Sequence, residues 1–390
     1  MTRRGRAVLG LGLLTYVVAR AFGALPLYPA ALGLLFVVFV GWLWVRLASG
    51  PMRLRREVSG NERLEGDDVR VRLELEHETQ VPPASLVLVE QVSGLGERRT
   101  PLEARHGAYT LRSLRRGRYA FLDVRAVIED AFGLQRAEVS LAAPTTLLVY
   151  PRLVTLERLF SEGGSYAQDG RRLLLRRPSG FDLHSVREYE QGESLRKVHW
   201  RSTAKRGELM VKELEDAPRD EVAVLLDAEA GPRPHVFDVQ VRAAGSLLLA
   251  QARRGRRAVL VINGAQRTTQ RVHSFETDWR AAYDLLAAAE PDGRTPASAL
   301  LAEDASAASR ARELTVVTSA LSAPLVERLL QRSLGQRQAA LVFVEPNGAG
   351  ERRPGLLRLQ TAGVPVAVVR TGDDLREKLT GTALRRVADA

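Results

Sequence analysis

Two long apolar runs at the beginning of the chain set the strongest limit on how it can fold. They read AVLGLGLLTYVVARAFGAL (residues 7–25) and LYPAALGLLFVVFVGWLWV (residues 27–45). An α-helix rises about 1.5 Å per residue, so about 20 apolar residues are enough to cross the hydrocarbon core of a bilayer. Pro26 and Pro29 leave little room for a loop between the two runs. The pattern predicts a transmembrane helical hairpin over residues 1–50.

The positive charge of the chain is concentrated around these runs. The formal net charge is +11, and no acidic residue precedes Glu57. From Glu57 onward the chain holds 49 of its 57 Lys and Arg residues and all 46 Asp and Glu residues. Loops rich in Lys and Arg stay in the cytoplasm. We therefore expect a multi-pass protein of the bacterial cytoplasmic (inner) membrane, with the bulk of the chain in the cytoplasm. A cleaved signal peptide is the alternative, since it also has a basic start followed by an apolar run.

The next hundred residues alternate apolar and polar positions in short runs separated by Gly and Pro. This period of two, rich in Val, Leu, Tyr and Phe, predicts an antiparallel β-sandwich of the immunoglobulin-like type over residues 51–151. Two turns are expected to join strands as hairpins, at residues 116–118 and 130–134. The expected strands are residues 69–76, 84–92, 108–114, 119–128 and 145–151.

From residue 221 the apolar runs become continuous, as in strands that are buried on both faces of a sheet. Helical stretches lie between them, which predicts an α/β domain with a doubly wound parallel sheet over residues 221–390. Residues 152–220 are interpreted as a connecting region and residues 291–312 as a looser insertion. The expected strands are residues 221–227, 257–263, 313–319, 339–345 and 364–370.

The first strand of this predicted sheet ends in Asp227, followed by Glu229 and Gly231. With the order of strands, this resembles a von Willebrand factor type A domain, whose metal-ion-dependent adhesion site has the pattern Asp-x-Ser-x-Ser. Here Glu229 and Gly231 replace the two serines that would bind a cation. Mg²⁺ prefers six oxygen ligands in near-octahedral geometry. We therefore assign no cofactor, and Mg²⁺ held by Asp227 and Glu229 is the alternative.

A charged stretch between the two predicted domains carries the strongest resemblance to a known family. It resembles the signature of the bacterial family called domain of unknown function 58, in which R-E-Y is followed by a Gly-Asp turn, an Arg, a Trp and a closing strand. Glu193 and Lys205 replace the usual Asp and Arg. The matching residues are Arg187, Glu188, Tyr189, Gly192, Glu193, Arg196, His199, Trp200, Lys205 and Gly207.

The resemblance extends to the apolar hairpin and to the predicted sheet, so it covers nearly the whole chain. It implies a membrane-anchored cytoplasmic protein that acts in assembly or maturation, frequently together with a MoxR-type AAA+ ATPase. It implies no established enzymatic activity, and no residue of this chain is assigned a catalytic role.

The composition of the charged stretch excludes several functions. Residues 181–216 hold seven basic and eight acidic side chains, so their net charge cannot drive binding to a nucleic-acid backbone. The chain has no Cys, which excludes disulfides and thiolate metal sites. His199 lies near several carboxylates, which leaves acid–base chemistry open.

Guanidinium groups pair with carboxylates and stack on indole rings. We therefore interpret the stretch as a joint between domains, with Trp200 buried, or as a surface for a partner. Two functional hypotheses remain: a membrane-tethered adaptor for an AAA+ ATPase, and a metal-assisted hydrolase or transferase at the mouth of the parallel sheet.

Overall fold

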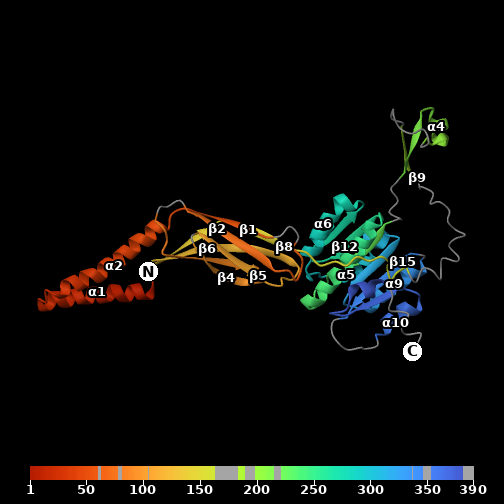
Figure 1. The fold of residues 1–390 in the computed structure, drawn as a ribbon. Helices are drawn as coiled ribbons and strands as arrows, with labels where there is room; N and C mark the ends of the chain where they lie inside the picture. Colours follow the sequence, from red (N-terminus) through yellow and green to blue (C-terminus); the bar gives the residue numbers. More distant parts are fainter. Residues whose placement is uncertain are drawn as a thin grey trace. The chain divides into compact units, whose positions relative to one another are not determined.

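The computed structural model divides the chain into two compact units, Met1–Tyr150 and Pro151–Ala390 (Figure 1). At the signature strands, residues 183–188 and 211–214, only the backbone is described. The structure describes residues 1–59, 63–77, 81–103, 105–162, 183–188, 198–214, 221–335, 337–345 and 353–380.

The first unit begins with two antiparallel helices, α1 (Arg3–Phe22) and α2 (Leu27–Ala48). Thr2 caps α1, because its side chain accepts a hydrogen bond from the Gly5 amide, and Gly23 ends the helix in the left-handed conformation. Small residues let the helices approach closely, and a Cβ atom at Gly12 would lie 3.1 Å from the Leu35 side chain. Both helices are long and apolar enough to cross a membrane.

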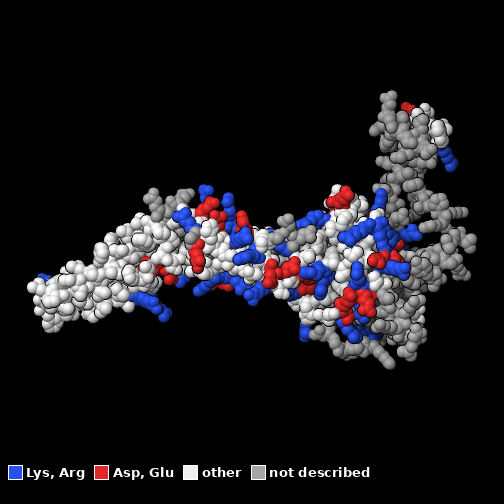
Figure 2. Space-filling view, viewed as in Figure 1, with Lys and Arg blue, Asp and Glu red and all other residues white. Residues whose placement is uncertain are grey.

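The large side chains of this helical hairpin point outward, in contrast to a soluble core helix. Its buried residues are mostly small, whereas Leu, Phe and Trp side chains along both helices are exposed. Figure 2 shows this part of the unit as an almost uncharged surface, whereas charged side chains cover the strands that follow. The exposed side chains include Leu11, Leu14, Val17, Phe22, Leu32, Phe36, Phe39, Trp42, Trp44 and Leu47.

The rest of the first unit consists of two antiparallel sheets around one hydrophobic core. The first has the order β1-β2-β5, and the second β4-β3-β6-β7, with β8 paired to β6. Residues in β2 alternate strictly between buried and exposed, and the buried ones pack with residues of β3 and β6. The strands are β1 (Met52–Val58), β2 (Val69–His77), β3 (Ser85–Val92), β4 (Gly96–Pro101), β5 (His106–Leu111), β6 (Gly117–Glu129), β7 (Arg136–Leu141) and β8 (Thr145–Val149).

One of the two predicted hairpin turns is confirmed and the other is wrong. Residues 130–134 join the paired strands β6 and β7. Residues 116–118, in contrast, lie where the chain passes from β5 in one sheet to β6 in the other, because β5 pairs with β2. A Gly between two Arg residues signals a change of direction, but it does not determine which strands pair.

A buried ion pair crosses the core of the two sheets. Arg56 donates to Glu90 at 2.5 Å and to the Thr145 hydroxyl at 2.7 Å, and both charged side chains are almost fully buried. The Tyr109 hydroxyl donates to the other Glu90 oxygen at 2.7 Å. Burial, followed by the Glu90 charge, raises the pKa of Tyr109, so the phenol remains the donor. This network is fully paired within the β-sheets and serves their packing.

The second unit contains a six-stranded sheet of order β13-β12-β11-β14-β15-β16. Five of its strands are parallel, and their order corresponds to 2-1-3-4-5 along the chain, as in doubly wound α/β folds. The strands are β11 (Val222–Leu226), β12 (Ala258–Asn263), β13 (Arg267–Val272), β14 (Glu313–Thr318), β15 (Gln338–Val344) and β16 (Val366–Val369).

Helices cover both faces of this sheet, since successive residues of the central strands belong to two different cores. Helices α5, α6 and α11 pack on the face of Val224 and Leu226. Helices α7 to α10 pack on the face of Ala223 and Leu225. The helices are α5 (Pro234–Arg253), α6 (Phe275–Ala288), α7 (Ala297–Ala302), α8 (Ala307–Arg310), α9 (Ala323–Leu334), α10 (Pro354–Thr361) and α11 (Leu375–Thr380).

The parallel buried strands are thus confirmed, with two differences. The edge strand β13 is antiparallel and was not predicted, because its polar sequence RTTQRV lacks a continuous apolar run. The predicted insertion at residues 291–312 contains α7 and α8, which help to cover one face of the sheet.

Candidate functional site

Asp227 lies at the carboxyl end of β11, in the centre of the six-stranded sheet. Its neighbours β12 and β14 end at Asn263 and Thr318. The carboxyl ends of parallel strands lie at the same edge of a sheet, where α/β proteins often bind ligands. The topology therefore brings three polar side chains from distant parts of the chain together in the interior.

Both carboxylate oxygens of Asp227 accept hydrogen bonds from the protein. The Thr318 hydroxyl donates to Oδ2 at 2.7 Å, and the Glu229 amide donates to Oδ1 at 3.3 Å. The Asn263 amide nitrogen lies 3.5 Å from Oδ1 and also donates to the Thr295 carbonyl oxygen. The Thr318 oxygen in turn accepts from the Ala320 amide at 2.9 Å. Each polar group of this cluster thus has a partner, as buried polar groups require.

Burial changes the titration of both acidic residues here. It raises the pKa of Asp227, and the hydrogen bonds from Thr318, Glu229 and Asn263 oppose the shift. Burial also raises the pKa of Glu229, and the nearby Asp227 charge raises it further. Perturbed carboxyl groups at a sheet edge are typical of functional sites, although buried structural acids show the same shift.

Gly293 completes the site by bringing a distant loop against β11. Its amide donates to the Ala228 carbonyl at 2.8 Å, and its carbonyl accepts from the Ala230 amide at 2.8 Å. A Cβ atom at position 293 would overlap the Asn263 carbonyl oxygen and lie 2.8 Å from that of Ala228. Only Gly permits this close approach.

Sequence reasoning found Asp227 and Glu229 but missed Asn263, Gly293 and the contact of Thr318 with Asp227. Asn263 ends the apolar run VLVIN, just as Asp227 ends its own apolar run. This shared position at the end of a strand could have indicated that Asn263 lies near Asp227. Gly293 lies in a polar loop, where the sequence alone does not reveal a close backbone contact.

A divalent cation would find few oxygen ligands in this cluster. Thr318 already donates its hydroxyl proton to Asp227, and positions 229 and 231 carry no hydroxyl. Within the described ranges, no group of three or more His, Asp or Glu residues is placed to hold a metal ion. The donor set that the structure describes fits Mg²⁺ poorly, since that ion demands six oxygen ligands.

The signature stretch forms a small element of its own. Strand β9 (Leu183–Glu188) pairs antiparallel with β10 (Met210–Leu214), so that Arg187 lies opposite Val211. The helix α4 (Trp200–Arg206) lies between them in the sequence and ends at Gly207, whose φ is +79°. The predicted residues Tyr189, Gly192, Glu193 and Arg196 lie outside the described residues.

His199 anchors the beginning of α4 to the strand that follows. Its backbone amide donates to the Met210 carbonyl at 2.7 Å, and its Nδ1 lies 2.7 Å from the Ser202 hydroxyl oxygen. The Met210 amide donates to the Thr203 hydroxyl oxygen at 3.0 Å. His199 therefore takes part in a local turn that holds α4 against β10.

Trp200 lies at the first position of α4. Its side chain is 66% exposed, and Arg201, Lys205 and Arg206 of the same helix are exposed as well. The joint between domains and the surface for a partner both stay predictions for this stretch.

A family model described as "Protein of unknown function DUF58" matches residues 185–380, half of the chain. The matched part contains α4, the Asp227 cluster and the six-stranded sheet. The chain belongs to the DUF58 family. The resemblance of the signature stretch is thus confirmed.

One curated relative of this DUF58 chain is a Bacillus subtilis protein with the name "Uncharacterized protein YeaD". It is 25% identical over 222 residues, which cover 55% of this chain and 54% of the relative. The aligned part thus spans about half the length of that relative.

Two solved structures match parts of this chain at low similarity. BslA, a bacterial hydrophobin, is 14% identical and covers 26% of this chain and 100% of its own, with a TM-score of 0.17. A conjugative transposon lipoprotein from Bacteroides eggerthii is 18% identical and covers 24% and 98%, with a TM-score of 0.14. Neither likeness carries an argument about the function of this DUF58 protein.

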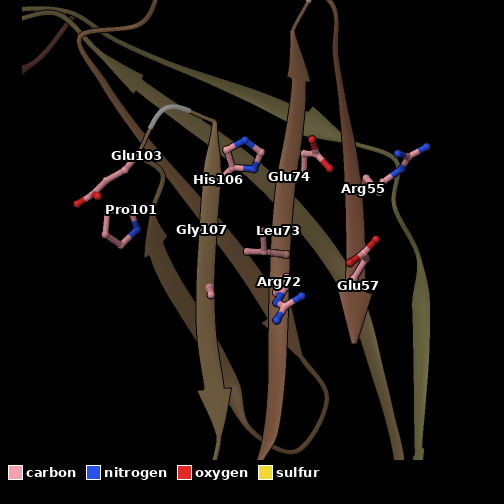
Figure 3. A pocket seen from close by; sticks show the side chains of 10 residues that line it. Arg55, Glu57, Arg72, Leu73, Glu74, Pro101, Glu103, His106 and Gly107 are labelled. Carbon is pink, nitrogen blue, oxygen red and sulfur yellow. The ribbon is translucent and has the colours of Figure 1, made fainter. Parts of the chain in front are cut away.

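The first unit also contains an open pocket of about 550 Å³ on its three-stranded sheet (Figure 3). Outward residues of β1 and β2 with opposite charges face each other across the two strands there. Arg55 lies opposite Glu74, and Glu57 lies opposite Arg72. Such cross-strand pairs stabilise a solvent-facing sheet. Because four of its charged residues face an opposite charge across the two strands, this pocket is a weaker candidate for a site than the Asp227 cluster or α4.

Proposed function

We propose that this DUF58 protein is a membrane-anchored adaptor or assembly and maturation factor that acts with a MoxR-type AAA+ ATPase. In this proposal the helical hairpin spans the bacterial cytoplasmic membrane, and the chain that follows it lies in the cytoplasm. The proposal also assigns the two antiparallel sheets to an immunoglobulin-like domain and the six-stranded sheet to a von Willebrand factor type A-like domain.

The hairpin supports anchoring through its pattern of exposure. Burying one large apolar side chain contributes about 1.5–3 kcal/mol, and α1 and α2 leave more than ten such side chains exposed. A water-exposed apolar surface of this size is unusual in a soluble protein. Arginines at the outer ends of the helices favour a cytoplasmic location for the following chain.

The single observation that carries the partner-binding part is the exposed Trp200 within the family signature. Trp and Arg are the side chains that most often dominate the binding energy of protein interfaces. Helix α4 presents both, with Arg201 directly after the indole and two further basic residues in its last turn. Such a surface suits a partner with an apolar pocket and an acidic rim. The choice of a MoxR-type ATPase as partner rests on the family resemblance.

A co-purification experiment tests this function. The full-length protein in detergent is expected to retain a MoxR-type ATPase from the same organism, and Trp200→Ala is expected to lose it with an unchanged melting temperature. Leu334→Ala is the matched control, because Leu334 is also exposed (84%) on the second unit but outside the signature. If Trp200→Ala still retains the ATPase, the proposed surface is contradicted. If Trp200→Ala lowers the melting temperature, the interpretation of the stretch as a joint between domains is favoured instead.

The second candidate function is a metal-assisted hydrolase or transferase at the mouth of the six-stranded sheet. The raised pKa values of Asp227 and Glu229 at the strand ends are the observation in its favour. Titration calorimetry of the full-length protein with Mg²⁺ distinguishes the two. Micromolar affinity that disappears in Asp227→Ala would favour the enzyme, whereas the adaptor proposal expects no such binding.

A further inference from the structure

The turn between β6 and β7 contacts the helical hairpin in the first turn of α1 and about two turns before the end of α2. The Thr2 amide donates to the Leu134 carbonyl at 3.0 Å, and the Thr2 hydroxyl donates to the Gly133 carbonyl at 2.7 Å. A Cβ atom at Gly5 would overlap the Leu134 carbonyl oxygen, and one at Gly41 would lie 3.1 Å from the Asp130 carboxylate. Two glycines, one on each helix, thus form a notch that receives the turn.

The turn itself is rigidly held. Asp130 is buried, and its two carboxylate oxygens accept from the Gln135 amide at 2.6 Å and the Phe132 amide at 3.2 Å. The Gly133 amide donates to the Asp130 carbonyl at 3.0 Å, and Gly133 has a φ of +66°. Because the carboxylate fixes the backbone on both sides, the position of Phe132 is determined by the turn. That side chain is 67% exposed.

The place of this contact along the hairpin corresponds to the edge of a membrane. Gly5 precedes the apolar run at Ala7 by two residues, or about 3 Å along the helix axis. Exposed arginines at positions 3, 4 and 6 surround it on α1, and the exposed Trp42 and Trp44 follow Gly41 on α2. Trp and Arg at the end of an apolar span are typical of the headgroup region.

We propose that the β6–β7 turn, held in the Gly5–Gly41 notch, inserts Phe132 into the headgroup layer of the phospholipid bilayer that the hairpin spans. This inference rests on the proposed membrane anchoring and adds a second contact with the lipid. Phe132 then continues the belt of Trp42 and Trp44, and the sheets are held at a fixed distance from the membrane surface. The exposed aromatic ring loses its contact with water on insertion.

Depth-dependent quenching tests this proposal in the full-length chain, which has no Cys of its own. Single cysteines replace Phe132, Leu122 and Phe36, and each carries a polarity-sensitive fluorophore in vesicles of phosphatidylcholine and phosphatidylglycerol. Leu122 is the matched control, since it is 68% exposed on β6 but seven residues, or about 23 Å, from Glu129 at the strand end. Phe36 lies in the middle of α2 and reports on the span itself.

We expect a quencher in the headgroup layer to act several-fold more strongly at position 132 than at 122, and a quencher deep in the acyl chains to act at 36. If position 36 is not quenched, the anchoring itself fails. If position 36 is quenched while 132 behaves like 122, anchoring holds and only the present proposal is overturned.

A second pair of variants tests the notch. Gly5→Leu in the Phe132→Cys protein is expected to abolish the headgroup quenching, because the side chain would displace the turn. Gly10→Leu is the control on the same helix, since a Cβ atom there meets nothing within 4 Å. Unchanged quenching in Gly5→Leu would contradict the docking of the turn on the hairpin.

Discussion

At the scale of single residues, Asp227 combines burial with a complete set of hydrogen-bond donors. Its raised pKa means that the folded state binds a proton more readily than the unfolded state. The contribution of this group to the free energy of unfolding is therefore greatest below the unfolded pKa of about 4 and falls as the pH rises through the folded pKa. We expect Asp227→Asn to gain stability relative to the wild type between acidic and neutral pH.

Melting temperatures of the full-length protein across this pH range measure the effect. Asp278→Asn is an internal control of opposite sign, because hydrogen bonds from the Ser274 and His273 amides lower the pKa of Asp278. That variant is expected to lose stability relative to the wild type as the pH rises. If the gain in melting temperature of Asp227→Asn over the wild type becomes smaller toward neutral pH, the burial argument is contradicted.

At the scale of elements, the approach of the Gly293 loop to the ends of β11 and β12 shapes the site. Gly293→Ala is expected to destabilise the second unit by about 1–3 kcal/mol, because the new methyl group meets backbone atoms of Asn263 and Ala228. Chemical denaturation followed by Trp279 fluorescence measures the loss, since this indole packs against the core of the sheet.

Gly335→Ala is the control for this prediction. A Cβ atom at position 335 meets its nearest neighbours at an ordinary contact distance of 3.5 Å. The free energy of unfolding of Gly335→Ala is expected to stay within about 0.5 kcal/mol of the wild-type value, as for most substitutions away from special contacts. Equal destabilisation by the two alanines would show that the loop can move away from the strand ends.

At the scale of the whole molecule, the arginines outside both spans predict that the chain after the helical hairpin lies in the cytoplasm. Single cysteines at Ser49 and Tyr28 test this in intact cells, because the native chain offers no competing thiol. A membrane-impermeant reagent is expected to label Tyr28→Cys and to leave Ser49→Cys unlabelled. Labelling of Ser49→Cys from outside would place the chain after the hairpin on the other side of the membrane.

The sequence determined the features that depend on local patterns. Apolar length predicted α1 and α2, strict alternation predicted β2, and continuous apolar runs predicted the parallel strands β11, β12, β14, β15 and β16. Each pattern is fixed by which faces of an element avoid water. The motif at residues 187–207 was sufficient for the DUF58 resemblance.

Only the tertiary structure decided the features that depend on residues far apart in the sequence. It paired β5 with β2 rather than β6, and it brought Asn263 and Thr318 to Asp227. It also left Trp200 exposed. It also placed the Phe132 turn in the Gly5–Gly41 notch. Strand pairing and burial are set by the competition among all possible long-range contacts, and a local pattern of residues does not record the outcome of that competition.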